Sequence, residues 1–100
     1  MDKRKPSYDL ENIKREFRSV ARLRMTGSAR DAAFSLGYLL QDVVDIIQSM
    51  TRKHFYKSMT SVSDVRLWQD VYHVPHCELM LYIKFTLGVD GLIILSFKEK

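Results

Sequence analysis

The sequence predicts an α+β fold, in which N-terminal helices pack on one face of an antiparallel sheet of about four to six strands. Two patterns carry this prediction. Apolar residues recur at helical spacing through the first half of the chain, and from residue 54 onward they alternate with polar residues, as in strands. The chain has 100 residues without a repeat or an obvious linker, so we expect a single domain over residues 1–100.

The front half predicts three helices and a short strand. Residues 9–21 are expected to form the first helix, residues 22–26 an edge strand, and residues 28–37 a second helix that stops at Gly37. A third helix is expected over residues 39–50. The apolar stripes of the first and third helices supply the expected core: Leu10, Ile13, Phe17, Val20, Leu39, Leu40, Val43, Val44, Ile47 and Met50.

The back half predicts strands, because the period of the apolar residues changes to two. One face of the third run is apolar from Leu79 to Leu87 and should carry the helices, with Trp68 and Tyr72 of the second run on the same face. The expected strands are residues 55–60, 66–73, 78–88 and 92–98.

The last hairpin has a preferred register. Pairing Phe85 with Leu95 keeps both on the apolar face and leaves the loop 89–91, whose final glycine suits a left-handed conformation. The same register sets Tyr82 opposite Lys98.

The registers of the first two strand pairs are less constrained. A few loop lengths keep the apolar residues of paired strands on the same face, and we choose one of them for each pair. A four-residue loop at 74–77 pairs Gln69 with Tyr82, and a five-residue loop at 61–65 pairs Lys57 with Gln69. These choices predict a row of polar side chains that crosses four strands on the face away from the helices: Lys57, Gln69, Tyr82 and Lys98.

The charge distribution is compatible with a polyanion. The chain has a net charge of +4, and residues 1–30 hold nine Lys and Arg against four acids. Ordinary solubility charge explains the same excess. No apolar run is long enough for a membrane span, the N-terminus has no signal-peptide core, and Cys77 is the single cysteine, so we expect a cytoplasmic protein with no membrane partner.

The residues favour a reaction that needs no cofactor and no metal. His54, His73 and His76 lack a ligand motif, and no serine-nucleophile, P-loop or dinucleotide signature is present. RNA cleavage needs none of these, because the 2′-hydroxyl of the substrate is the nucleophile. Lysines can stabilise the charge at phosphorus, a tyrosine or histidine can move protons, and a glutamine can orient the substrate.

Three stretches resemble the motility quorum-sensing regulator (MqsR) family of mRNA interferase toxins: FYKSMT at 55–60, SDVRLWQDVY at 63–72 and LIILSFKEK at 92–100. The resemblance implies a RelE-like fold and a metal-independent endoribonuclease that cleaves mRNA at short GC-beginning sites of the GCU type. It also implies an MqsA-like antitoxin, which binds zinc in one domain and DNA through its other domain.

The resemblance transfers the family's catalytic residues to Lys57, Gln69, Tyr82 and Lys98. The family carries arginine where this chain has His73, and a histidine can carry a proton where an arginine only clamps phosphate. The neighbours expected to bind substrate are Phe55, Met59, His73 and Lys84.

A non-catalytic toxin on the same scaffold is the alternative, because RelE/ParE-like relatives include toxins that bind DNA gyrase and fold alone does not fix function. The predicted row of Lys57, Gln69, Tyr82 and Lys98 discriminates between the two, since a gyrase-binding toxin does not require it.

Overall fold

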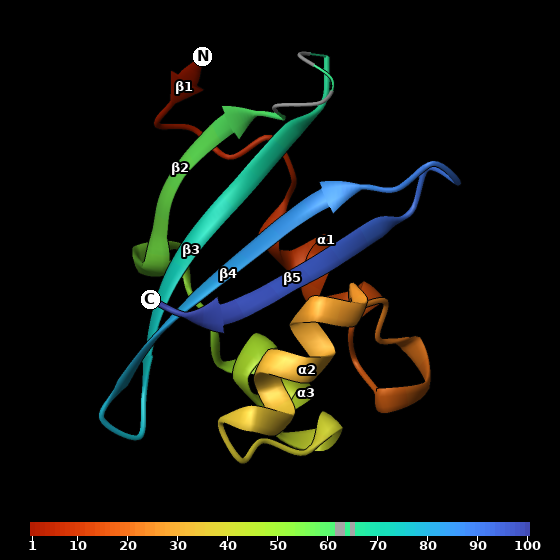
Figure 1. Ribbon diagram of the computed structural model, residues 1–100. Coiled ribbons are helices and arrows are strands. Elements are labelled where there is room, and N and C mark those ends of the chain that lie inside the picture. The colour runs from red at the N-terminus through yellow and green to blue at the C-terminus, as the bar shows by residue number, and fades with distance from the viewer. Residues whose placement is uncertain (62–63, 65) are drawn as a thin grey trace.

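The computed structural model describes residues 1–61, 64 and 66–100 and confirms the α+β fold class (Figure 1). In this part of the chain, three α-helices gather against one side of a five-stranded antiparallel sheet, whose strands follow one another in the order β1-β2-β3-β4-β5. Two 3-10 turns, at Val20–Arg22 and Arg52–His54, connect the elements. The bounds are β1 (Asp2–Lys3), α1 (Leu10–Glu16), α2 (Gly27–Ser35), α3 (Leu40–Ser49), β2 (Phe55–Thr60), β3 (Trp68–His76), β4 (Leu79–Leu87) and β5 (Ile93–Glu99).

Helix α1 is shorter than predicted. It is capped by Asp9, whose carboxylate accepts from the backbone N–H of Asn12, and it ends at Glu16. Phe17 still reaches the core, where its ring stacks on Phe85 with the centroids 5.9 Å apart. Val20 lies beyond the helix and is 38% exposed, so its predicted place in the core is wrong.

The other two helices follow the prediction closely, except that Leu39 precedes α3 and is 69% exposed, so its predicted place in the core is wrong. Thr26, rather than Ser28, caps α2 by accepting from the backbone N–H of Ala29. The chain leaves α2 through Gly37, whose φ of 87° lies in the left-handed region that glycine favours. Helix α3 buries one stripe against the sheet: Val43, Val44, Ile46 and Ile47.

The predicted strand at 22–26 is a single parallel bridge between Met25 and Leu95. The backbone N–H of Leu95 donates to the carbonyl of Arg24, and that of Thr26 donates to the carbonyl of Leu95. The segment therefore covers the outer edge of β5, and the sheet's other edge is the two-residue strand β1.

The sheet has an apolar helix-side face, as predicted. Tyr72, Leu81, Ile83, Phe85 and Leu95 are fully buried there with the helices. The last hairpin confirms its register, because Phe85 pairs with Leu95 and Tyr82 with Lys98. Gly91 ends the loop with a φ of 80°.

The predicted register of β3 and β4 is wrong. Strand β3 continues through Pro75 to His76, and the turn is the pair Cys77 and Glu78, with φ values of 48° and 66°. Tyr82 therefore pairs with His73 instead of Gln69. The proline is tolerated because β2 pairs with β3 only as far as Tyr72, which leaves Pro75 without a neighbour on that side.

The predicted register of β2 and β3 is wrong by two residues. Lys57 pairs with Val71, and Met59 pairs with Gln69. The predicted loop at 61–65 lies partly outside the described residues. A bulge between Phe55 and Lys57 adds an unpaired residue, Tyr56, to β2.

Candidate functional site

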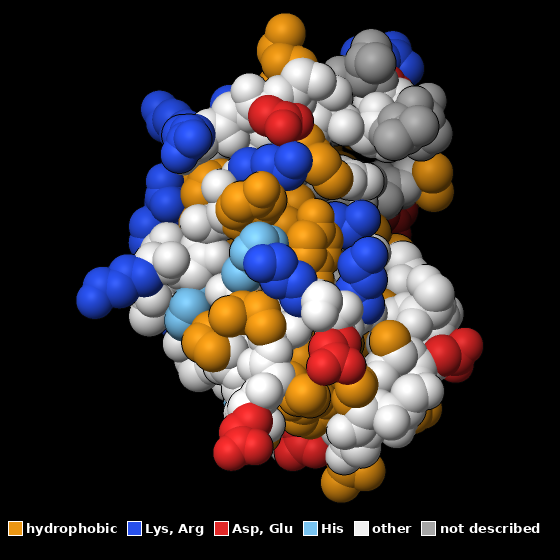
Figure 2. All heavy atoms as spheres, turned by 60° about the vertical axis from the view of Figure 1, so that its left-hand side comes forward, with side chains coloured by type: hydrophobic (Ala, Val, Ile, Leu, Met, Phe, Trp, Pro, Cys, Tyr) orange, Lys and Arg blue, Asp and Glu red, His pale blue; other side chains and the backbone are white. Residues whose placement is uncertain are grey.

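The face of the sheet turned away from the helices, here called the open face, carries most of the candidate residues. On the side that Figure 2 turns forward, Lys, Arg and His side chains surround side chains of the hydrophobic class, which includes tyrosine. Pairing assigns side chains to this face from each of the four longer strands: Lys57 and Met59 from β2, Gln69 and His73 from β3, Tyr82 and Lys84 from β4, and Lys98 from β5.

The bulge in β2 sends Phe55 and Tyr56 to opposite faces. Phe55 pairs with Tyr72 and packs with the helix-side core, where the two ring centroids are 5.5 Å apart. The predicted position of Phe55 beside Lys57 is therefore wrong. Tyr56 takes that position on the open face, where its ring stacks on His73. A bulge cannot be recognised from the alternation of apolar and polar residues, so nothing in the sequence indicated that Tyr56 lies on the open face.

Three rings form a column across the open face. Tyr56 stacks on His73 with the centroids 4.2 Å apart and the planes at 21°, and His73 lies 5.3 Å from Tyr82. The register explains the second contact, because His73 and Tyr82 are directly paired. The ring column presents flat aromatic surface of the kind on which nucleobases stack.

Two lysines lie at the Tyr82 end of the ring column. The Nζ atom of Lys98 is 5.2 Å from the centre of the Tyr82 ring, and that of Lys84 is 6.0 Å from it. Burial lowers the pKa of Lys84, and the positive charge of Lys98 lowers that pKa further. A phosphate between these ammonium groups would relieve their repulsion, so this end of the column favours an anion.

Lys57 binds a carboxylate at the next position along β2. Its Nζ atom donates to Oδ2 of Asp2 at 3.1 Å, and this hydrogen bond raises the pKa of Lys57. Lys57 also lies over the ring of Tyr56, 5.5 Å from its centre. It is therefore fully protonated at neutral pH and ready to exchange Asp2 for another anion.

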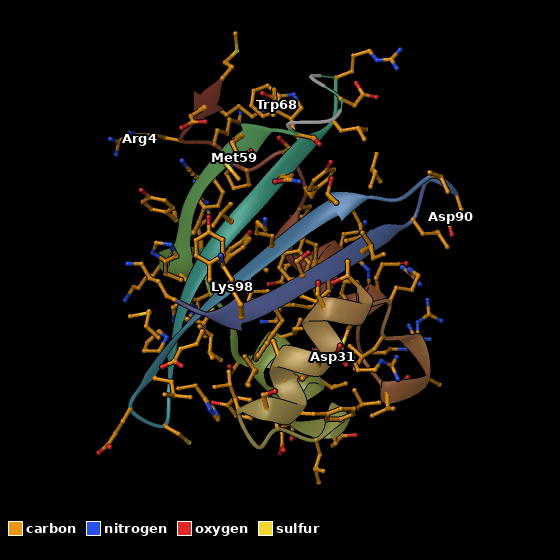
Figure 3. All side chains as sticks on the ribbon, viewed as in Figure 1. Arg4, Asp31, Met59, Trp68, Asp90 and Lys98 are labelled. Atoms are coloured by element: carbon orange, nitrogen blue, oxygen red, sulfur yellow. The ribbon has the colours of Figure 1, made fainter. Side chains whose placement is uncertain are left out.

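The predicted row of four residues is not formed. Tyr82 and Lys98 stand side by side, whereas Gln69 pairs with Met59 and Thr86. Gln69 is four residues from His73 along β3, a distance of about 13 Å. Figure 3 shows Met59, the neighbour of Gln69, well apart from Lys98. Gln69 thus shares the open face with Tyr82 and Lys98 but lies apart from them along the strands.

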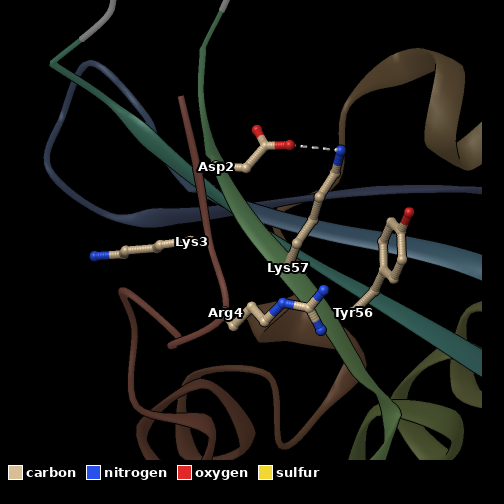
Figure 4. Close-up of a pocket in the computed structure, with 5 residues that line it drawn as sticks. All are labelled: Asp2, Lys3, Arg4, Tyr56 and Lys57. Carbon is tan, nitrogen blue, oxygen red and sulfur yellow. Dashed lines mark hydrogen bonds and ion pairs between the residues drawn. The ribbon is translucent and has the colours of Figure 1, made fainter.

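A hollow lies at each end of the ring column. One, of about 300 Å³, is lined by Tyr56 and Lys57 and by residues 2–4 (Figure 4). The other, of about 220 Å³, lies between the sheet and α2, where Tyr82, Lys84 and Lys98 meet Ser28 and Ala32.

His73 is half-buried in the middle of the ring column. Its Nε2 atom has no hydrogen-bond partner among the described residues. Burial, and to a smaller extent the charge of Lys100, lowers the pKa of His73. The ring is therefore neutral at neutral pH and packs between two tyrosines, unlike an arginine that clamps phosphate.

The other two histidines have local partners. His54 accepts from the backbone N–H of Thr51, and Nδ1 of His76 bonds the hydroxyl of Tyr38 at 2.8 Å. Among residues 1–61, 64 and 66–100, no three His, Cys, Asp or Glu side chains come together as metal ligands. In the same part of the chain, no helix is long and apolar enough to cross a membrane.

Comparison with known proteins agrees with the resemblance of the three sequence stretches. Residues 5–99 match the family described as motility quorum-sensing regulator, toxin of MqsA. The chain is also 38% identical over 100 residues to the mRNA interferase toxin MqsR of Escherichia coli (strain K12), and the match covers 100% of both chains. The chain therefore belongs to the motility quorum-sensing regulator family of toxins.

Proposed function

We propose that the protein is the toxin of a toxin–antitoxin pair and an endoribonuclease that cleaves mRNA bound along the open face. The observation that carries the proposal is the pairing of Tyr82 with Lys98, with Lys84 beside them, on the face that also presents Lys57. The curated relative is named as an mRNA interferase, and its match covers the whole chain.

The chemistry follows from these groups. The substrate's 2′-oxygen attacks the adjacent phosphorus and loses its proton, and the bond to the 5′-oxygen breaks as that oxygen gains a proton. Lys57, Lys84 and Lys98 stabilise the added negative charge, so the reaction proceeds without a metal. Tyr82, whose ring lies 5.3 Å from His73 and 5.2 Å from the Lys98 ammonium, transfers a proton. Cleavage leaves a cyclic 2′,3′-phosphate and a free 5′-hydroxyl.

Gln69 and Met59 act on a neighbouring nucleotide. They pair with each other on the open face, two positions beyond Lys57. They are too far from Tyr82 for one phosphate to contact both this pair and Tyr82. The amide of Gln69 can hydrogen-bond a base edge, and the Met59 side chain can pack on its ring. We therefore assign them to recognition of a short GC-beginning site of the GCU type.

The family description, toxin of MqsA, supports a proposal for the partner. The antitoxin is an MqsA-like protein that holds zinc in one domain and binds DNA through the other, so the zinc belongs to the partner and not to this chain. We propose the cytoplasm as its location, because the proposed mRNA substrate is found there.

The test is cleavage of a defined transcript by purified protein with EDTA present, with cut sites mapped by primer extension. Lys57→Ala and Lys98→Ala should abolish the cuts, whereas Lys53→Ala, which removes an exposed lysine before β2, should keep them. Full activity of both active-site variants would refute the assignment. An intact transcript together with an SOS response after induction in cells would support the gyrase-binding alternative.

A further inference from the structure

The hollow between the N-terminal strand and β2 has the composition of a nucleotide site. It is lined by Asp2, Lys3, Arg4, Tyr56 and Lys57, and Figure 4 shows the Arg4 side chain extending across it toward Lys57 and Tyr56. We propose that this hollow is a second nucleotide subsite, in which a base flanking the cleaved bond stacks on Tyr56 and its phosphate binds Arg4. The proposal rests on the RNA-cleaving function proposed above.

Tyr56 is held as a stacking surface. The bulge places its ring on the open face, and one side of the ring is fixed against His73 at a centroid distance of 4.2 Å. The residue is nevertheless 52% exposed. A base on the exposed part of the ring would extend the ring column by one member beside the Lys57 ammonium, whose Nζ atom lies 5.5 Å from the ring centre, and stacking of this kind tolerates any base.

Arg4 is the available cation of the hollow. Lys57 is paired with Asp2, and Lys3 lies over the ring of Trp68 at 4.2 Å. Among the residues that the structure describes, the guanidinium of Arg4 has neither an acidic nor an aromatic partner. A planar guanidinium with free donors matches two oxygens of one phosphate.

The positive charge of the hollow favours an anion, and the Tyr56 ring favours an aromatic group on that anion. Three cations and one carboxylate give it a net charge of +2, and this charge is the same whether Asp2 stays paired with Lys57 or is displaced by RNA. Because Tyr56 and Tyr82 belong to one ring column, a strand with its phosphate at Tyr82 and Lys98 has an adjacent nucleotide within reach of the hollow. A nucleotide of the bound RNA satisfies all of these features together.

The experiment measures binding separately from cleavage. The probe is a fluorescent RNA that carries 2′-deoxyribose at the cleavage position, together with versions shortened one nucleotide at a time from each end. Tyr56→Leu and Arg4→Ala should each bind the full probe about tenfold more weakly than the natural protein. One shortened probe lacks the nucleotide that the hollow holds. Each variant should bind that probe as tightly as the natural protein does, because neither protein can use the hollow for it.

Matched controls exclude general effects. Phe34 is 51% exposed on α2, so Phe34→Leu removes an equally exposed aromatic ring elsewhere. Arg18→Ala removes an exposed arginine on the helix side. Both should keep the affinity of the natural protein. Tyr56→Trp, which keeps a stacking surface, should also keep it, and a thermal melt of each variant checks folding.

The outcomes separate this inference from the function on which it rests. Natural affinity of Tyr56→Leu and Arg4→Ala for the full probe would overturn the subsite, even if the natural protein cuts its transcript. So would an equal loss of affinity for every shortened probe. Failure of the natural protein to cut any transcript would overturn the nuclease instead, and the probe affinities would still decide whether the hollow binds a nucleotide.

Discussion

The Nζ atom of Lys57 lies 3.1 Å from Oδ2 of Asp2, so the lysine to which we assign a phosphate already holds a carboxylate. Asp2 belongs to β1, which pairs with β2 through Met59 and Ser58. The N-terminal ammonium donates to Oγ1 of Thr60 and keeps this strand in place. RNA must therefore displace Asp2 before it reaches Lys57.

Removal of the Asp2 carboxylate should strengthen RNA binding. In Asp2→Asn the pKa of Lys57 should fall toward its ordinary value, but the lysine stays charged and is free for phosphate. An exposed ion pair of this kind contributes little, so we expect affinity for non-cleavable RNA to rise about two- to fivefold at low salt. Fluorescence anisotropy measures the change. Asp31→Asn, at an exposed position on α2, alters net charge equally, and an equal gain there would contradict the prediction.

Tyr82 should act as a proton donor to the leaving oxygen. Tyr82→Phe keeps the ring beside His73 and Lys98 but removes the hydroxyl, so the cleavage rate should fall about 100-fold. A substrate with sulfur in place of the bridging 5′-oxygen has a leaving group that needs no proton. The variant should cut this substrate nearly as fast as the natural protein does. An equal deficit on both substrates would show that Tyr82 acts in another way.

His73 should make the stability of the protein depend on pH. Burial lowers its pKa in the folded state, so below about pH 6.5 the unfolded chain binds more protons than the folded protein. The free energy of unfolding should therefore fall as the pH is lowered from about 7.5 to about 5. The groups that face His73 are Tyr56, Tyr82 and the Lys100 ammonium.

Urea denaturation at several pH values measures this dependence. Part of the slope should disappear in both His73→Gln and His73→Tyr, since neither side chain titrates there. His73→Tyr keeps an aromatic ring in the column, so it separates the loss of the proton from the loss of stacking. Unchanged slopes in both variants would show that the lowered pKa of His73 does not govern acid sensitivity.

The parts of the sheet predicted correctly are those with a local signal. Gly91 fixes a left-handed turn, so the last hairpin and the pairing of Tyr82 with Lys98 follow from the sequence. The turn between β3 and β4 offers no such signal. It uses Cys77 and Glu78 at positive φ, where asparagine or glycine is usual, and Pro75 looks like the end of a strand.

The choice of the candidate residues and the prediction of their arrangement rest on different signals. Residue types and the resemblance identified Lys57, Tyr82 and Lys98, and parity assigned their face. Parity cannot detect a bulge, and so the exchange of Phe55 for Tyr56 on the open face could not be predicted. The Asp2 contact was equally hidden, because β1 has only two residues and no pattern of its own.

Asp70 holds the segment between β1 and α1 against the sheet. Its side chain is fully buried, with Oδ1 accepting from the backbone N–H of Ser7 at 2.9 Å and Oδ2 from that of Tyr8 at 2.8 Å. Asp70→Ala leaves both amides unsatisfied, so we expect the free energy of unfolding to fall by about 3 kcal/mol.

Tyr72→Phe is the matched control on the same strand. The Tyr72 hydroxyl is buried, burial raises its pKa to about 12, and it has no hydrogen-bond partner among the described residues. Its removal should change the free energy of unfolding by less than about 1 kcal/mol, because no bond is lost. Asp70→Asn, which keeps one acceptor, should lie between the two. Urea denaturation ranks the variants, and equal stability of Asp70→Ala and Tyr72→Phe would show that the Asp70 anchor does not stabilise the fold.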